Sequence, residues 1–165
     1  DLPVTPPMFS SMGELKSVTF LGRDGMGGDV YNLVFANGKA IMSAGLDTEG
    51  RMAGGILRPL KGSAPTPGTE AALRSLVSGL ASGSPDYDKL SPQFAQIVRR
   101  DLPSTHGLFS SMGELKSVTF LGRGDMGDDA YDLVFSKGGV IMSASLDADG
   151  KMAGGFFQPV APPAR

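Results

Sequence analysis

Hydrophobic and polar residues alternate along two parts of this chain, in segments as long as β-strands. In the first part the alternating segments are 15–21, 30–35, 40–46 and 51–58. In the second part they are 115–121, 130–135, 140–146 and 151–158. Short turn sequences rich in glycine, asparagine and aspartate separate them, so each part predicts four sequential strands in an antiparallel meander. Asn37-Gly38 is typical of a tight hairpin turn in which both residues have positive φ.

The two parts are copies of one sequence, offset by 100 residues. Phe9–Arg23 returns unchanged as Phe109–Arg123, and 39 of residues 1–60 equal the residue 100 positions later. This identity indicates a tandem duplication of one sheet.

The sequence between the two copies has the period of an α-helix. Within 69–82 the apolar side chains Ala72, Leu73, Leu76, Val77 and Leu80 recur about one turn apart and form a stripe. Ser84-Pro85-Asp86 and Ser91-Pro92-Gln93 are typical of helix starts, because serine caps a helix and proline fits its first turn. We expect the later helix to run to about Arg100.

We also expect short helical turns at 8–13 and 105–112, each just before a meander. The predicted organisation is then the sheet half of a first repeat at 1–60, a linker at 61–68 and a complete second repeat at 69–165. The predicted fold class is α+β, with two four-stranded antiparallel meanders related by a pseudo-two-fold axis and a central helical segment. We expect the two sheets to pack on each other as in a dimer of single units.

The predicted core consists of apolar strand and helix positions together with their counterparts in the second copy. These positions are Val18, Phe20, Leu33, Phe35, Met42, Leu46, Leu73, Leu76, Val77, Leu80, Phe94 and Ile97. The first copy has no helices of its own in this sequence, so its apolar sheet face needs a cover. A missing N-terminal segment, self-association or a swapped element would supply one.

Composition and charge exclude several function classes. The net charge is −2 and the longest basic run is Arg99-Arg100, which argues against a nucleic-acid partner. No apolar run approaches the ~20 residues that span a membrane. The chain has no cysteine, which excludes disulfides, thiolate catalysis and zinc–thiolate sites.

Several segments within residues 66–160 together resemble a known family. They are Leu73–Leu80, Pro85-Asp86-Tyr87, Ser91–Arg100, 115–120, 129–131, Phe135 and 146–154. In this order they resemble the nuclear transport factor 2-like (cystatin-like, SnoaL-like) α+β fold, in particular small domains of exported bacterial proteins. The resemblance implies a curved sheet that wraps around helices, so that sheet and helices together form a cone-shaped apolar pocket. In catalytic members that pocket holds an aspartate base and a tyrosine or aspartate oxyanion donor.

Tyrosine and aspartate side chains on the second strand of each copy are the best candidates for chemistry. Asp129 precedes Tyr131 by two positions and shares its strand face, so the two could orient a ligand or act as acid and base. Asp132 is the one acid in the middle of a strand, and Asn32 stands in its place in the first copy. If the protein is an enzyme, Tyr131, Asp129 and Asp132 are therefore the candidate catalytic residues.

Two tyrosines and two methionines are candidates for binding a small apolar ligand, although the sequence favours ordinary core or sheet packing for the same residues. Tyr31 and Tyr131 are polar handles that still pack as apolar rings. Met42 and Met142 stand beside small residues on the third strands, where a methionine adapts to an irregular ligand surface. These four residues are the candidate binding residues.

Metal and cofactor sites are not expected. Asp47–Gly50 and Asp147–Gly150 resemble the opening of a calcium loop but lack its closing glutamate, so we interpret them as hairpin turns. The glycine-rich stretch Gly22–Asp29 lacks a following helix and is interpreted as an ordinary loop. His106, the only histidine, is expected in a turn at the surface.

The sequence favours a non-catalytic binding or assembly module, since so few polar groups could do chemistry. The alternative is a small-molecule enzyme of the cyclase or isomerase type with an apolar cone pocket. The resemblance and the absence of an initiator methionine suggest export, but the compartment is not determined.

Overall fold

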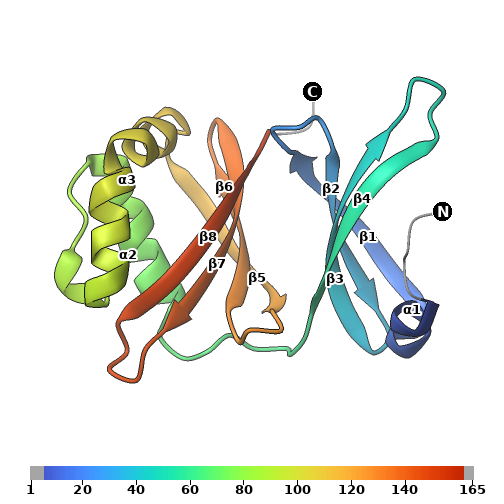
Figure 1. Cartoon of the computed structure of the whole chain (residues 1–165), viewed down its shortest axis with the longest axis horizontal. Helices are drawn as coiled ribbons and strands as arrows, with labels where there is room; N and C mark the ends of the chain where they lie inside the picture. Colours follow the sequence, from blue (N-terminus) through green and yellow to red (C-terminus); the bar gives the residue numbers. More distant parts are fainter. Residues whose placement is uncertain (1–5, 162–165) are drawn as a thin grey trace.

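The computed structural model describes residues 6–161, which form two four-stranded antiparallel sheets with helices packed against their outer sides (Figure 1). The strand orders are β1-β2-β3-β4 in sheet A and β5-β6-β7-β8 in sheet B. Neighbours in the sequence are therefore neighbours in each sheet. The predicted α+β class with two meanders is confirmed.

The strand bounds agree between the two copies. Sheet A contains β1 (Leu15–Arg23), β2 (Asp29–Phe35), β3 (Gly38–Leu46) and β4 (Met52–Leu60). Sheet B contains β5 (Leu115–Arg123), β6 (Asp129–Phe135), β7 (Gly138–Leu146) and β8 (Met152–Val160). Each predicted strand is present, with ends that differ from the predicted bounds by no more than two residues.

The hairpin turn between β2 and β3, predicted at Asn37-Gly38, differs from its prediction. The turn consists of Ala36 and Asn37, because Gly38 already pairs as the first residue of β3. Neither Asn37 nor Gly38 has a positive φ. The backbone N–H groups of Ala36 and Asn37 donate to the carbonyl oxygens of Glu14 (2.8 Å) and Met12 (2.9 Å). These bonds hold the turn with ordinary backbone angles, so the expected left-handed turn is not needed.

The two sheets face each other through their inner sides, which bury a small apolar cluster. Its members are Val30, Ile41, Leu60, Leu121, Ala130, Ile141 and Val160. They come from equivalent strands of both copies, as expected for sheets related by a pseudo-two-fold axis. We call the opposite sides of sheets A and B their outer faces.

The sheets also join at two corners by backbone pairing. Arg23 exchanges hydrogen bonds with Ala161, and Lys61 exchanges them with Arg123 in the same way. Gly22 precedes the first corner with a φ of +138°, and a side chain there would collide with the carbonyl of Ala161. Glycine at this position thus permits both the backbone angle and the close approach.

Helices α2 (Thr69–Ser82) and α3 (Pro92–Ser111) cover the outer face of sheet B, with a short 3-10 helix η1 (Tyr87–Lys89) between them (Figure 1). The bounds of α2 equal those predicted. Ser91 caps α3, its hydroxyl accepting from the N–H of Phe94 at 3.3 Å.

The prediction that the second helix ends near Arg100 is wrong. Helix α3 continues through Pro103 and includes the expected separate turn at 105–112, except for Met112 as its cap. Phe109 is completely buried in the core and attaches the last turns of α3 to sheet B. His106 consequently lies on this helix, half-buried, with Nδ1 2.9 Å from the carbonyl oxygen of Leu80, and not in a surface turn.

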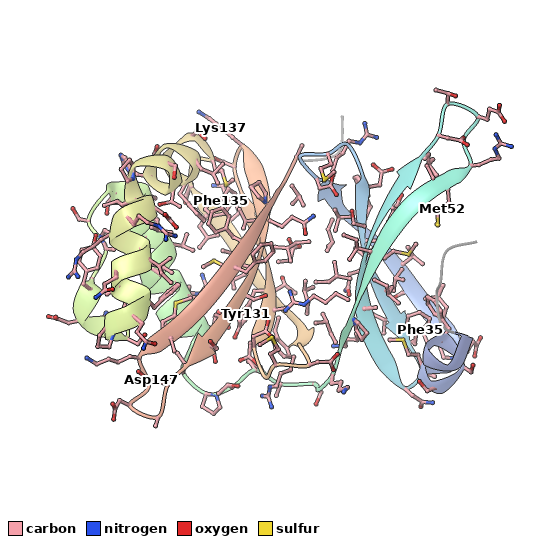
Figure 2. The ribbon with its side chains drawn as sticks, viewed as in Figure 1. Phe35, Met52, Tyr131, Phe135, Lys137 and Asp147 are labelled. Carbon is pink, nitrogen blue, oxygen red and sulfur yellow. The ribbon has the colours of Figure 1, made fainter. Side chains whose placement is uncertain are left out.

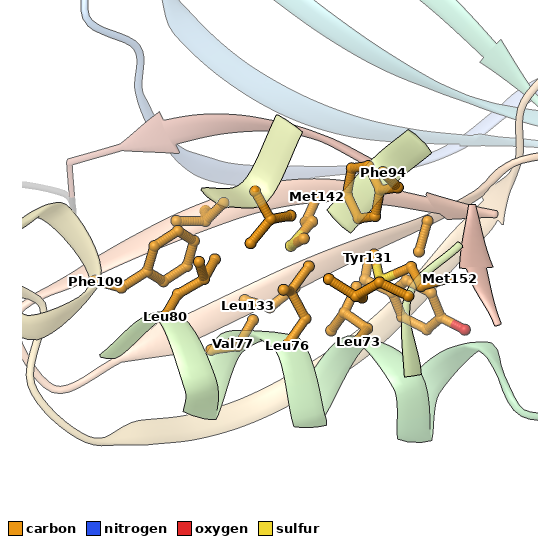
Figure 3. Packing of buried hydrophobic residues seen from close by; sticks show 14 of the residues in the cluster. Leu73, Leu76, Val77, Leu80, Phe94, Phe109, Tyr131, Leu133, Met142 and Met152 are labelled. Carbon is orange, nitrogen blue, oxygen red and sulfur yellow. The ribbon is translucent and has the colours of Figure 1, made fainter. Parts of the chain in front are cut away.

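The main core lies between α2, α3 and sheet B (Figure 3). Its helix side contains Leu73, Leu76, Val77, Leu80, Phe94, Val98 and Phe109. Its sheet side contains Tyr131, Leu133, Phe135, Val140, Met142, Ala144 and Met152. The helical segment therefore covers sheet B, and within residues 6–161 sheet A has no equivalent cover.

Among residues 6–161, the short helix α1 (Pro6–Met12) is the one helix on the outer face of sheet A. The Phe9 ring packs against Phe35 with centroids 6.0 Å apart, as Phe109 packs against Phe135 at the same separation. Four predicted core residues are exposed instead of buried: Val18, Phe20, Leu46 and Ile97. The first three lie on the outer face of sheet A, and Ile97 lies half-exposed beside the cavity between the helices and sheet B.

Candidate binding surface

The outer face of sheet A is an apolar surface that no helix pair of the described residues covers. Strand alternation places Val18, Tyr31, Leu33 and Met42 on this face, and Met52 joins them after a bulge in β4. Met52 and Phe35 lie on the side of sheet A that points away from sheet B (Figure 2). Val18 is 53% exposed and Met52 is 51% exposed.

The same positions in sheet B are covered. Met152 and Tyr131 are 0% exposed, and Met142 is 2% exposed. Helices α2 and α3 supply the apolar atoms that exclude water from these side chains. The two faces carry nearly the same residues, so the difference in burial comes from the helices.

An arginine, an aspartate and a tyrosine form a cluster at one edge of the outer face of sheet B. The Asp129 side chain is 1% exposed, and its Oδ1 lies 3.1 Å from Nε of Arg123. The N–H of Thr66 donates to Asp129 Oδ2 at 2.6 Å, and the Thr66 hydroxyl donates to Oδ1 at 3.3 Å. Arg123 in turn donates to the carbonyl of Ala64 at 3.4 Å. Asp129 thus holds the linker in place just before α2 begins.

Tyr131 completes this cluster but does not present a reactive hydroxyl. Its hydroxyl oxygen is buried and has no hydrogen-bond partner within the described residues. Burial, followed by the negative charges of Asp129 and Glu70, raises the pKa of Tyr131 to about 12. The Thr69 hydroxyl acts weakly in the opposite direction without satisfying hydrogen-bond geometry. Tyr131 therefore stays protonated at neutral pH, in contact with the helices.

The first copy contains the same cluster in an open state. Arg23 Nε lies 2.9 Å from Asp29 Oδ1, and the Tyr31 hydroxyl donates to Asp29 Oδ2 at 3.5 Å. The side chains of Arg23 and Asp29 are 63% and 26% exposed. No linker equivalent to residues 64–66 reaches Asp29 within the described part of the chain. Tyr31 and Met42, two predicted binding residues, belong to this open face.

Asp132 is not part of the cluster. Strand alternation places it on the inner face of sheet B, opposite to Tyr131 and Asp129. Burial raises the pKa of its carboxyl above the ordinary value. Its counterpart Asn32 also has a buried side-chain oxygen without a partner among the described residues. The predicted catalytic set is therefore split between two sides of the sheet.

The space between the helices and sheet B is small. Its cavity measures ≈ 90 Å³ and is lined mainly by Leu76, Leu80, Phe94 and Met142. Pockets for small molecules usually measure about 300 to 1,000 Å³. The acid that lines this cavity, Asp101, is hydrogen-bonded to Arg100, which lowers the pKa of its carboxyl.

Two larger open grooves lie along the inner faces of the sheets, with volumes of ≈ 660 and ≈ 440 Å³. Arg58 and Phe156 line both, and Arg58 forms an ion pair with Asp128 across the sheets. The alternation of residues along the strands does not predict these grooves. Two differences between the copies could have indicated the ion pair, since Arg58 matches Gln158 and Asp128 matches Gly28.

The aspartates that open the last turn of each copy stabilise hairpins. Asp147 Oδ1 accepts from the backbone N–H groups of Asp149 (3.0 Å) and Lys151 (2.9 Å). Asp47 accepts from Glu49 and Arg51 in the same way, both at 2.9 Å. Residues 6–161 contain no group of three or more potential metal-binding side chains.

Comparison with protein-family models, with curated proteins and with solved structures finds no match to this chain. The resemblance to the nuclear transport factor 2-like fold stays a prediction, because two antiparallel sheets with helices do not identify that fold. No helix in the described residues is both long and apolar enough to cross a membrane.

Proposed function

We propose that this chain is a non-catalytic binding and assembly module that engages its partner through the outer face of sheet A. The carrying observation is the contrast between Met52, which is half-exposed, and Met152, which is buried at the same position of the second copy. A contiguous apolar face of this kind is typical of an interaction site. A nuclear transport factor 2-like fold for residues 69–161 is part of the proposal, supported by the order of helix pair and meander.

The state of the candidate catalytic residues supports a non-catalytic role. The carboxylate of Asp129 is engaged by Arg123 and Thr66 under the linker. Tyr131 is buried, and Asp132 lies on the other side of the sheet. An acid–base pair must reach the same substrate atoms, and these three residues do not share an accessible site.

Methionine oxidation provides a test that contains its own controls. Peroxide converts exposed methionine to the sulfoxide, and burial slows the reaction. In the isolated chain Met52 should react, Met126 should react faster because it is 96% exposed, and Met152 should resist. In the assembly isolated from the native source, we expect Met52 to become resistant while Met126 remains reactive.

Mass spectrometry of tryptic peptides reads this result, since the peptides that contain Met52 and Met152 differ in sequence. Equal reactivity of Met52 in the isolated chain and in the native assembly would contradict the proposal. Protection of Met126 in place of Met52 would move the binding surface to the grooves on the inner faces.

A further inference from the structure

We infer that the occupant of the outer face of sheet A is an amphipathic helix pair that follows an extended segment, of the same kind as residues 64–105. This inference rests on the proposed function and identifies the partner class. The second copy provides the template, because its outer face is the same surface with the occupant in place. Apolar packing and two polar contacts define that template.

The apolar part of the template is a face that already fits two helices. In sheet B, Leu73 and Leu76 of α2 and Phe94 of α3 pack on Tyr131, Leu133, Met142 and Met152 (Figure 3). Sheet A has the identical residues Tyr31, Leu33, Met42 and Met52 at the equivalent positions, with the same strand register. An apolar helix stripe with this spacing would therefore meet the same side chains on sheet A.

The first polar contact is the carboxylate at the edge of the face. Asp129 receives the N–H and the hydroxyl of Thr66 from the extended segment, three residues before α2 begins at Thr69. Asp29 is oriented by Arg23 just as Asp129 is oriented by Arg123. Asp29 is therefore positioned to accept an N–H from a segment that enters a helix.

The second polar contact is a backbone carbonyl at the open edge of the sheet. The N–H of Ser91, the residue before α3, donates to the carbonyl of Met152 at 2.9 Å. No backbone N–H from outside the sheet reaches the carbonyl of Met52 among the described residues. The start of a second helix would supply that donor at the same place.

Helix α1 shows that the end of this binding mode is already present on sheet A. Residues 6–12 correspond by the offset of 100 to residues 106–112, which include the last turns of α3. Phe9 occupies the position on Phe35 that Phe109 occupies on Phe135. The remaining face is thus the part that α2 and the first turns of α3 cover in the second copy.

A helix pair fits this surface better than the flat sheet of a second copy. The side-chain face of a sheet presents no backbone N–H groups, so it would leave Asp29 without a new donor. Helix α1 also projects from one end of the outer face, where a second sheet would have to lie flat. An extended segment that leads into a helix satisfies both conditions.

The first experiment adds a separate polypeptide of residues 61–105 to the full chain and follows backbone amide signals by NMR. We expect the signals of Asp29 and Met52 to shift, while those of Asp129 and Met152 stay unchanged under their own helices. In the full chain, D29A should weaken the affinity about tenfold, because a charge-assisted hydrogen bond is lost. M52E should weaken it at least as much, and M126E, at an exposed methionine on another surface, should not change it.

A covalent fusion makes the test independent of how tightly the separate polypeptide binds, because the added segment stays attached to the chain. In the fusion, residues 61–100 precede Asp1, so the junction Arg100-Asp1-Leu2-Pro3 repeats the native Arg100-Asp101-Leu102-Pro103. We expect the oxidation rate of Met52 to fall towards that of Met152, with Met126 unaffected.

Two results would overturn the inference. One is full reactivity of Met52 in the fusion together with no shift at Asp29 or Met52 in the mixture. The other is unchanged affinity of the 61–105 polypeptide for the D29A and M52E chains. If Met52 is nevertheless protected in the native assembly, the proposed function stands and the partner is not a helix pair.

Discussion

Met52 and Met152 occupy the same position in two copies of one sequence, yet Met52 is half-exposed and Met152 is fully buried. The strands around them have the same register, and both methionines follow the same turn. The helices α2 and α3 make the difference, because they cover sheet B and leave sheet A to α1. Identical local sequence can therefore serve as core in one place and as surface in another.

The polar edges of the two faces differ in the same way. Asp129 is sealed by the linker and Asp29 is open to solvent, although each pairs with its arginine. The sealed cluster contributes to the structure of the second copy, whereas the side chains of the open cluster remain accessible to solvent. Matched substitutions in the two copies can break or sharpen this comparison.

The largest contrast should come from M152E and M52E. A carboxylate at position 152 would be buried among apolar side chains, and we expect a loss of about 3 kcal/mol or more in the free energy of unfolding. At position 52 the carboxylate stays in water, so the change should be within about 0.5 kcal/mol. Chemical denaturation measures the free energy of unfolding of both variants. Similar losses in M152E and M52E would show that sheet A is also covered.

A smaller contrast is expected for D129A and D29A. D129A leaves the Thr66 N–H without its acceptor and Arg123 without its buried partner, which should cost about 3 kcal/mol. D29A removes a partly exposed ion pair and should cost about 1 kcal/mol or less. Hydrogen exchange of the Thr66 amide measures the loss of this contact directly, and we expect it to become faster in D129A. Slow exchange at Thr66 in D129A would contradict the anchoring role of the Asp129 carboxylate.

On the inner faces, D132N should raise stability slightly at neutral pH and convert the position to the residue of the first copy. Burial raises the pKa of Asp132 in the folded state, so the folded chain binds this proton more tightly than the unfolded chain does. The contribution of Asp132 is therefore most favourable at low pH and is lost as the pH rises through the raised pKa. The gain from D132N should disappear in acid, and a gain independent of pH would argue against the buried carboxyl as its cause.

The smallest effect at neutral pH is expected for Y131F, since the Tyr131 hydroxyl has no hydrogen-bond partner in the described part of the chain. The raised pKa of about 12 means that the folded state resists ionisation of this hydroxyl. Stability should then fall as the pH rises from about 10, the ordinary value, towards about 12. Between these pH values the melting temperature should fall less for Y131F than for the native chain. Equal falls would contradict the role of Tyr131 in the loss of stability.

The alternation of residues predicted the eight strands and their order, and the stripe from Ala72 to Leu80 predicted α2. The sequence analysis placed the end of α3 wrongly because Pro103 and Gly107 are typical of helix ends, whereas the packing of Phe109 extends the helix beyond them. It placed Asp129 and Tyr131 on one strand face. It could not show that Thr66 covers Asp129, because that contact joins residues 63 positions apart.

By itself the sequence determined the duplication, the α+β class and the presence of two apolar sheet faces with one helical segment between them. These properties depend on local periodicity and on identity between copies, both of which can be counted along the chain. Only the tertiary structure decided which face α2 and α3 cover. Val18, Phe20 and Leu46 have the same apolar character as their second-copy counterparts, so their exposure depends on neighbours distant in sequence and not on their own pattern.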